Sequence, residues 1–305
     1  MKKIAVIGSL NVDYVLNVNH TPMIGETILS NKLDIQPGGK GANQAYAISR
    51  MGSQVSMFGA VGDDSNAPIV LDNLRNVGVD VTNVVYLEEP TGVALITVDS
   101  NGDNCIIVSQ GANAKVSAEY IDLCLSILEQ YDIIIFQLEI PLETVKYAAD
   151  KLKKMGKTII LDPAPAPGKL PDELLKNVDY IKPNENELSK LSGITDITSH
   201  LEEACDILLG QGVKCVLASL GSAGVMIKNN SGKGQIYPAE KIKAIDTTAA
   251  GDSFTAAIAY ALANERSIEQ AVRFANKVAA LVVQREGAQR SIPSKETIQE
   301  IWCNI

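Results

Sequence analysis

Short runs of apolar, mostly β-branched residues recur along the chain and predict buried strands. They occupy 3–8, 131–137, 157–162, 180–183 and 214–221. Longer segments between them carry apolar residues at i, i+3 and i+4, the spacing of a helix with one buried face. We expect helices at 42–51, 65–77, 117–129, 141–155, 186–191, 201–211, 250–263, 268–285 and 294–302. Strands that are apolar on both faces and alternate with helices predict a doubly wound, mostly parallel α/β sheet flanked by helices.

Two stretches depart from this alternation. Residues 92–110 contain two β-like runs around an Asn-Gly turn and predict a hairpin. Residues 12–36 alternate short β-like pieces with Pro and Gly turns. We expect these segments to pair into a small β-sheet inserted in a single α/β domain of residues 1–305. The sequence leaves open whether this sheet is a lid over a cleft or a structural flap.

Composition narrows the class of protein. Hydrophobic residues make up 46% and charged residues 21%, and no low-complexity linker divides the chain, which is typical of one compact domain. The net charge of −9 argues against nucleic acid as a partner. The five cysteines are scattered and suggest neither a disulfide framework nor a zinc site. No apolar run approaches the ~18 residues of a membrane span, so we expect a cytoplasmic protein without a membrane partner.

The segment "DTTAAGDSFTAA" (246–257) leads into an alanine-rich helical pattern. The first turn of a helix has unpaired amides and the positive end of the helix dipole, which together attract anions. Ala249, Ala250 and Gly251 are small enough for a phosphate to approach the backbone. Asp252 would then lie beside the phosphate and could accept a proton from an attacking hydroxyl. The alternative is that Asp252 only complements the helix dipole.

The segment "PGGKGANQA" (37–45) is a second glycine-rich helix entry. It lacks the GK[ST] ending of a Walker A motif, and "VIGSLNVD" lacks the spacing of a dinucleotide fingerprint. Without this fingerprint, the sequence offers no strong support for an enzyme that transfers a hydride. The glycines allow close approach of a small ligand, and Lys40 and Asn43 offer donors there. A purely structural helix entry is the alternative.

Further polar side chains follow predicted strands, where ligands bind in open α/β sheets. They are Asn11, Asp13, Glu139, Asn184 and Glu187. Their joint placement favours a polyhydroxylated ligand that needs several hydrogen bonds. The glycine-rich strand exit "SLGSAG" could pass beneath a nucleotide.

Together these segments resemble the ribokinase family of carbohydrate kinases. The likeness runs through "GSLNVD", "GGKGANQA", "QLEIPLE", "DPAPA", "KPNENE", "SLGSAG", "DTTAAGDSF" and "REGAQRSIP", and so covers essentially the whole chain. It implies a ribokinase-like fold with a small β-sheet lid, and a kinase that uses ATP, Mg²⁺ and a monovalent K⁺ activator.

The resemblance also assigns roles to residues. Asp252 would be the catalytic base, with an anion hole formed by the amides of Ala249, Ala250, Gly251 and Asp252. The sugar-binding positions would be Asn11, Asp13, Gly39, Lys40, Asn43 and Glu139. The nucleotide and its magnesium would meet Asn184, Glu187, Ser219, Leu220, Gly221, Ser222, Ala223, Gly224, Gly251 and Asn276. The monovalent cation would lie among Asp246, Thr248, Val282, Arg285, Gly287 and Ser291.

The activity implied is phosphorylation of the 5-hydroxyl of D-ribose. A kinase for fructose, a deoxy-sugar or a nucleoside, and a non-catalytic sugar sensor, are the alternatives. Thr255, Ala256, Ser219 and Asn276 depart from residues that are frequent in the family, and all four concern the nucleotide side. Because so small a sheet is marginal alone, we also expect the lid to pair with a second subunit in a homodimer.

Overall fold

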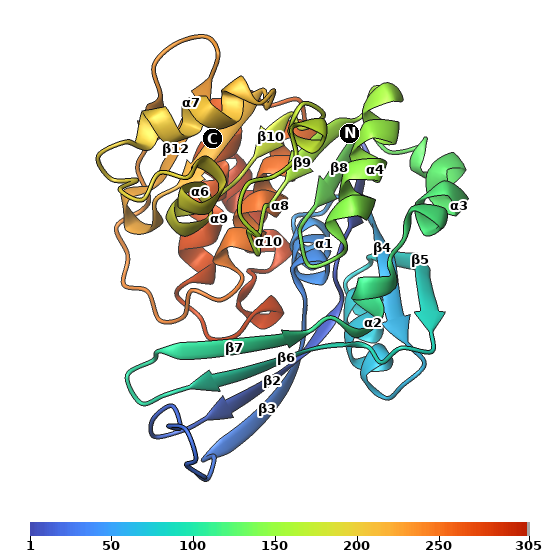
Figure 1. Ribbon diagram of the computed structural model, residues 1–305, viewed down its shortest axis with the longest axis vertical. Coiled ribbons are helices and arrows are strands. Elements are labelled where there is room, and N and C mark those ends of the chain that lie inside the picture. The colour runs from blue at the N-terminus through green and yellow to red at the C-terminus, as the bar shows by residue number, and fades with distance from the viewer. Residues whose placement is uncertain (304–305) are drawn as a thin grey trace.

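A nine-stranded sheet forms the centre of the molecule in a computed structural model that describes residues 1–303 (Figure 1). Its strand order is β13-β12-β11-β10-β9-β8-β1-β4-β5. The strands are β1 (Ile4–Ile7), β4 (Val55–Gly62), β5 (Asp80–Leu87), β8 (Ile133–Phe136), β9 (Thr158–Leu161), β10 (Tyr180–Ile181), β11 (Cys215–Ser219), β12 (Val225–Asn229) and β13 (Gln235–Tyr237). Pairing is parallel from β5 to β11, whereas β12 and β13 are antiparallel.

Helices cover both faces of this sheet. On one face lie α1 (Lys40–Arg50), α2 (Asn66–Asn76), α8 (Ala250–Ala263), α9 (Ile268–Val282) and α10 (Lys295–Cys303). On the other lie α3 (Ala118–Leu128), α4 (Leu142–Lys154), α5 (Asp172–Leu175), α6 (Glu185–Ser192) and α7 (Leu201–Gly210). Short 3₁₀ turns span Gly111–Lys115, Gly221–Ala223 and Gln289–Ser291. Side chains alternate along β1 between the two cores, Ile4 and Val6 to one and Ala5 and Ile7 to the other.

The predicted doubly wound fold is confirmed, and each predicted strand and helix has a counterpart. The sequence reading missed β4, β5, β12, β13 and the one-turn α5. In β4, small residues interrupt the apolar run by which a buried strand is recognised. Glycine is required at position 59, because a Cβ there would lie 2.6 Å from the Gly8 carbonyl oxygen. The helix predicted at 268–285 ends at Val282 instead, where the chain turns and the Ile245 amide donates to the Val283 carbonyl at 2.7 Å.

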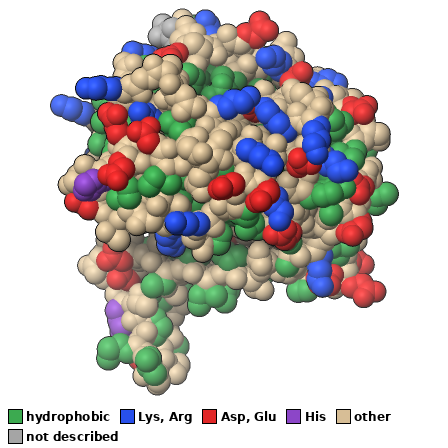
Figure 2. Space-filling view, turned by 45° about the horizontal axis from the view of Figure 1, so that its top comes forward, with side chains coloured by type: hydrophobic (Ala, Val, Ile, Leu, Met, Phe, Trp, Pro, Cys, Tyr) green, Lys and Arg blue, Asp and Glu red, His purple; other side chains and the backbone are tan. Residues whose placement is uncertain are grey.

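The two irregular stretches form a separate four-stranded sheet, which we call the lid. It contains β2 (Asn11–Asn17), β3 (Lys32–Gly38), β6 (Gly92–Val98) and β7 (Asn104–Ser109), in the order β3-β2-β6-β7. The predicted hairpin is the antiparallel pair β6–β7, and the central pair β2–β6 is parallel. The lid projects from the main body, and hydrophobic side chains are visible on the projection (Figures 1 and 2).

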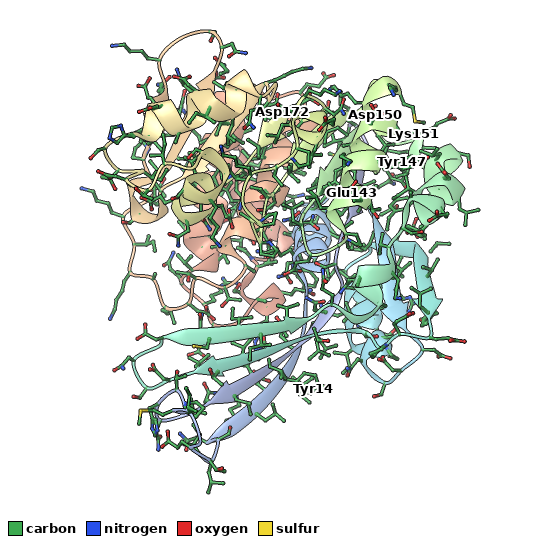
Figure 3. The ribbon with its side chains drawn as sticks, viewed as in Figure 1. Tyr14, Glu143, Tyr147, Asp150, Lys151 and Asp172 are labelled. Atoms are coloured by element: carbon green, nitrogen blue, oxygen red, sulfur yellow. The ribbon has the colours of Figure 1, made fainter. Side chains whose placement is uncertain are left out.

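A hydrogen bond anchors the lid to the domain. The Tyr14 hydroxyl on β2 donates to Asn66 Oδ1 on α2 at 2.9 Å. Figure 3 shows Tyr14 on the lid, far from Glu143, Tyr147 and Lys151 along α4. None of the helices in the part of the chain that the structure describes is long and apolar enough to cross a membrane.

Candidate active site

A cleft of about 700 Å³ opens at the carboxyl end of the parallel strands. It is lined from several distant segments, because each βα connection ends at this edge. Lys40 at the start of α1, Asp162 after β9 and Lys182 after β10 meet the first turn of α8 there. Such a cleft can hold a ligand the size of a nucleotide.

The N-terminus of α8 is open toward this cleft. Its N-cap, Ala249, has left-handed backbone angles (φ 59°, ψ 7°) and no side-chain cap. The Ser253 amide donates to the Ala249 carbonyl at 2.9 Å, and the Ala250 amide donates to Thr247 at 3.2 Å. The amides of Gly251 and Asp252 precede the first intrahelical bond and have no acceptor within the helix. These two amides, with the helix dipole, suit an anion.

Asp252 is buried in this first turn and held by two amides from α1. Asn43 Nδ2 donates to Asp252 Oδ2 at 2.9 Å, and Gln44 Nε2 donates to Oδ1 at 3.1 Å. Gln289 Nε2 in turn donates to Asn43 Oδ1 at 3.1 Å. These hydrogen bonds fix the orientation of the Asp252 carboxylate beside the open amides. A general base needs such a fixed orientation to reach the hydroxyl from which it takes a proton.

Asn11 and Glu139 lie on the sugar side of the predicted site and are both engaged in hydrogen bonds. Asn113 Nδ2 donates to Asn11 Oδ1 at 2.8 Å. Glu139 Oε2 accepts from the Ser9 hydroxyl at 2.5 Å and from the Lys40 amide at 3.2 Å. Glu139 thereby ties the end of β8 to the start of α1, which fixes both predicted sugar-binding segments.

Negative charges crowd around Asp13 on the lid strand β2. Burial, followed by the charges of Glu139 and Asp252, raises the pKa of Asp13 to about 7. Burial opposes the charged form of Lys40, but the attraction of Asp252, Asp162, Glu139 and Glu187 outweighs it and raises the Lys40 pKa. Lys40 therefore remains an ammonium that offsets the surrounding carboxylates.

Asn184 and Glu187, on the predicted nucleotide side, form a capping box at α6. Asn184 Oδ1 accepts from the Glu187 amide and Glu187 Oε2 accepts from the Asn184 amide, both at 2.8 Å. Asn276 Nδ2 donates to the Tyr237 and Pro238 carbonyls at 3.1 Å each, so this amide supports the wall of the cleft. The nucleotide positions that line the cleft are Asn184, Glu187, Ser219, Gly221, Ser222, Gly224, Gly251 and Asn276, while Leu220 and Ala223 are not part of the lining.

The predicted cation positions partly converge on Asp246. Its Oδ1 accepts from the Thr248 amide at 2.8 Å and its Oδ2 from the Gly287 amide at 2.8 Å. Burial alone would raise the pKa of Asp246, but the hydrogen bonds from the Thr248 hydroxyl and from the Thr248 and Gly287 amides, together with the charge of Arg290, outweigh it and lower the pKa. Val282 and Ser291 are also buried, and they form local hydrogen bonds: the Arg285 amide donates to the Val282 carbonyl, and the Ser291 hydroxyl donates to the Ala288 carbonyl.

Four polar residues of this region escaped the sequence reading. Gln137, Asp162 and Lys182 each follow a strand directly, so the rule that identified Asn11 and Glu139 would have found them. Gln44 lies inside the "GGKGANQA" motif. Gln137 Nε2 donates to Gln44 Oε1 at 2.6 Å, and Gln44 Nε2 donates to Asp162 Oδ2 at 3.0 Å, so these residues form one buried network behind Asp252.

Magnesium at this site would take ligands from a bound nucleotide as well as from the protein. Within residues 1–303 there is no cluster of three or more His, Cys, Asp or Glu side chains that could hold a metal. Mg²⁺ usually keeps several waters and binds one or two carboxylates together with substrate phosphates. Glu187 lines the cleft on the predicted nucleotide side, and one such carboxylate fits magnesium that arrives with a nucleotide.

Comparisons with known proteins agree with this geometry. The model of the pfkB family of carbohydrate kinases matches residues 1–295. The chain is 37% identical to the ribokinase of Haemophilus influenzae over 302 residues, with 98% of each chain covered. It is also 36% identical to the deoxyribokinase of Salmonella typhi, with 97% of each covered. The structure of Arabidopsis thaliana ribokinase complexed with ribose and ATP matches with a TM-score of 0.89 at 33% identity, covering 98% of both chains. The chain therefore belongs to the pfkB family of carbohydrate kinases.

Proposed function

We propose that this kinase transfers the terminal phosphoryl group of ATP to the 5-hydroxyl of D-ribose. The observation that carries the proposal is the position of Asp252, whose buried carboxylate lies in the same helical turn as the open Gly251 amide. The ribokinase relatives and the structural match to a ribokinase with ribose and ATP support the choice of sugar and nucleotide.

Asp252 and the α8 amides have separate tasks in this reaction. The sugar hydroxyl gives its proton to the Asp252 carboxylate as its oxygen attacks the phosphorus. The amides of Gly251 and Asp252 stabilise the charge on the transferred group. Asn11, Asp13, Gly39, Lys40, Asn43 and Glu139 orient the sugar, and Asn184, Glu187, Asn276 and the segment Ser219–Gly224 surround the nucleotide. Most of the acceleration then comes from positioning and electrostatics.

A monovalent cation completes the proposal. One carboxylate and several carbonyls suit K⁺, which is weakly hydrated. Asp246, Thr248, Val282, Arg285, Gly287 and Ser291 would hold it. The ion would order the segment that leads from Asp246 to Asp252, so its effect should be on kcat. Equal rates at fixed ionic strength when K⁺ is exchanged for a bulky organic cation would contradict this part.

A homodimer through the outer face of the lid is the last part of the proposal. Asp13 lies close to Glu139 and Asp252 and so faces the site, whereas the residues paired with its neighbour Tyr14 lie on the opposite face of the lid. This row contains Ile35, Leu95 and Ile107, which are 46%, 49% and 70% exposed. An exposed apolar row on a small sheet favours burial against a second copy. Ile107→Lys should give a monomer by light scattering, and a monomeric wild-type protein at micromolar concentration would contradict the dimer.

A substrate panel tests the sugar assignment. ADP release should be measured with Mg²⁺ and K⁺ on D-ribose, 2-deoxyribose, fructose and a nucleoside. Ribose should give the highest kcat/KM. A tenfold or larger preference for another acceptor would replace ribose, and the deoxyribokinase relative makes 2-deoxyribose the most informative competitor. Ribose binding by calorimetry without ADP formation would instead indicate a sugar sensor.

A further inference from the structure

Lys182 is a buried cation with unused hydrogen-bond donors. Its side chain, in the segment after β10, is 7% exposed, and Nζ lies 3.2 Å from Asp162 Oδ1. The two groups form an ion pair without a hydrogen bond, and Asp162 Oδ1 is a buried oxygen that has no hydrogen-bond partner. Across residues 1–303, no acceptor forms a hydrogen bond with the Lys182 ammonium. Lys182 lines the cleft, so N–H groups that make no hydrogen bond to the protein are available to a ligand there.

The Lys182 ammonium lies against the first turn of α8. A Cβ atom built on Gly251 would be 3.1 Å from Lys182 Nζ. Both residues line the cleft. The full positive charge is therefore next to the open amides of Gly251 and Asp252, where the transferred group would accumulate negative charge. A fixed cation at such a place stabilises a transition state more than it would in water.

Asp162 holds this lysine in place. Asp162 is completely buried, and its other oxygen accepts from Gln44 Nε2 at 3.0 Å. Burial raises the pKa of Asp162 to about 6, against the opposing effect of Lys182 and Lys40. The ion pair of 3.2 Å holds the ammonium on the Asp162 side of the cleft, and the absence of a hydrogen bond in this pair leaves the N–H groups of Lys182 available.

We propose that Lys182 is a catalytic residue that donates hydrogen bonds to the transferred phosphoryl group, and that Asp162 is its positioning residue. This rests on the proposed phosphoryl transfer. A bond forms between the sugar oxygen and the terminal phosphorus, and the bond from that phosphorus to the bridging oxygen of ADP breaks. The hydroxyl proton passes to Asp252. Lys182 keeps its three protons and supplies positive charge throughout.

The competing role for Lys182 is that of a counter-ion for buried Asp162. Lys182→Met would then harm the protein only because it leaves an unpaired buried charge. The double variant Lys182→Met with Asp162→Asn removes both charges and keeps both shapes, so it separates the two roles. Lys182→Arg keeps the charge. Lys190→Met, on the exposed side of α6, is the matched control for loss of a lysine charge.

The experiment compares these variants in steady-state kinetics and in ligand binding. With Lys182 as a catalytic residue, both Lys182→Met and the double variant should lose about 10²-fold in kcat, with less than about threefold change in KM for the sugar. The Kd of ADP should change little. The transition-state mimic of ADP, aluminium fluoride and sugar should bind at least about 10²-fold more weakly. Lys182→Arg should recover part of the rate, and Lys190→Met should match the wild type.

Recovery of wild-type kcat in the double variant would overturn the proposal and leave Lys182 as a counter-ion. A wild-type affinity of Lys182→Met for the fluoride complex would overturn it as well. The assay uses whichever sugar the wild-type enzyme phosphorylates best. Preference for a sugar other than ribose therefore refutes the ribose assignment without affecting the test of Lys182.

Discussion

Gln44 donates a hydrogen bond of 3.1 Å to Asp252, although the two residues are 208 positions apart in the sequence. The same amide nitrogen also donates to Asp162. The side-chain carbonyl of Gln44 faces Gln137, which donates to it, so the orientation of the amide follows from its partners. One glutamine thus sets the direction of the proposed base and connects it to the Asp162–Lys182 pair.

Replacement of this glutamine should slow turnover more than it weakens sugar binding. Gln44→Glu removes the N–H donors and adds a third acid beside Asp252 and Asp162. We expect kcat to fall roughly 10- to 100-fold and KM for the sugar to change less than about threefold. Steady-state kinetics checks this split. Gln270→Glu is the matched control, because glutamate also serves at that capping position of α9. Equal loss in both variants would contradict a positioning role for Gln44.

The raised pKa of Asp13 gives sugar binding a pH dependence. With a pKa of about 7 in the folded protein, Asp13 gains its full charge only above neutrality. Because a carboxylate accepts hydroxyl hydrogen bonds better than a carboxylic acid, sugar affinity should rise between pH 6 and pH 8. Calorimetric titration of the sugar across this range checks the trend. Asp13→Asn should bind weakly and without this dependence, and a flat wild-type profile would contradict the assignment.

The raised pKa of Asp13 should also lower the stability of the folded protein as the pH rises, whereas it raises sugar affinity over the same range. Its folded pKa is raised above the unfolded value of 3.8, so its contribution to stability is complete below that value and is lost as the pH rises through about 7. Asp13→Asn has no carboxyl group to titrate at this position, so its stability should not fall in this way as the pH rises. The variant should therefore gain roughly 2 kcal/mol in free energy of unfolding, relative to wild type, between pH 5 and pH 8. Urea unfolding at both pH values measures it, and an unchanged difference would refute the shift.

Gly39 should tolerate substitution less well than a glycine of similar backbone angle elsewhere. Gly39 has φ 89°, and a Cβ there would lie 2.7 Å from the Asn11 amide nitrogen. Gly156 has φ 77° with nothing within 4 Å. Gly156→Ala should cost about 1 kcal/mol for the left-handed backbone alone. Gly39→Ala should cost roughly 3 kcal/mol or more and raise KM for the sugar, because Asn11 must move. Equal costs would show that the contact is unimportant.

The sequence predicted the parts of the site that carry a local signal. The small residues of 249–251 ahead of Asp252 indicated an open helix terminus, and the polar residues after strands indicated one edge of the sheet. It could not show that Gln44 reaches both Asp162 and Asp252, because those contacts depend on how α1 packs against α8. The Asn184-x-x-Glu187 spacing is itself a capping-box signature, whereas the pairing of the Ala250 amide with the Thr247 carbonyl depends on the loop geometry and has no such signature.

The catalytic role of Asp252 is tested most directly by kcat of Asp252→Asn in a ribose-dependent ADP-release assay. The substitution keeps the shape of the side chain and removes the proton acceptor. We predict a loss of about 10²-fold or more in kcat, with a smaller loss of ribose affinity and an unchanged circular dichroism spectrum. Turnover close to wild type in the folded variant would contradict the account and leave Asp252 as a residue that only complements the dipole of α8.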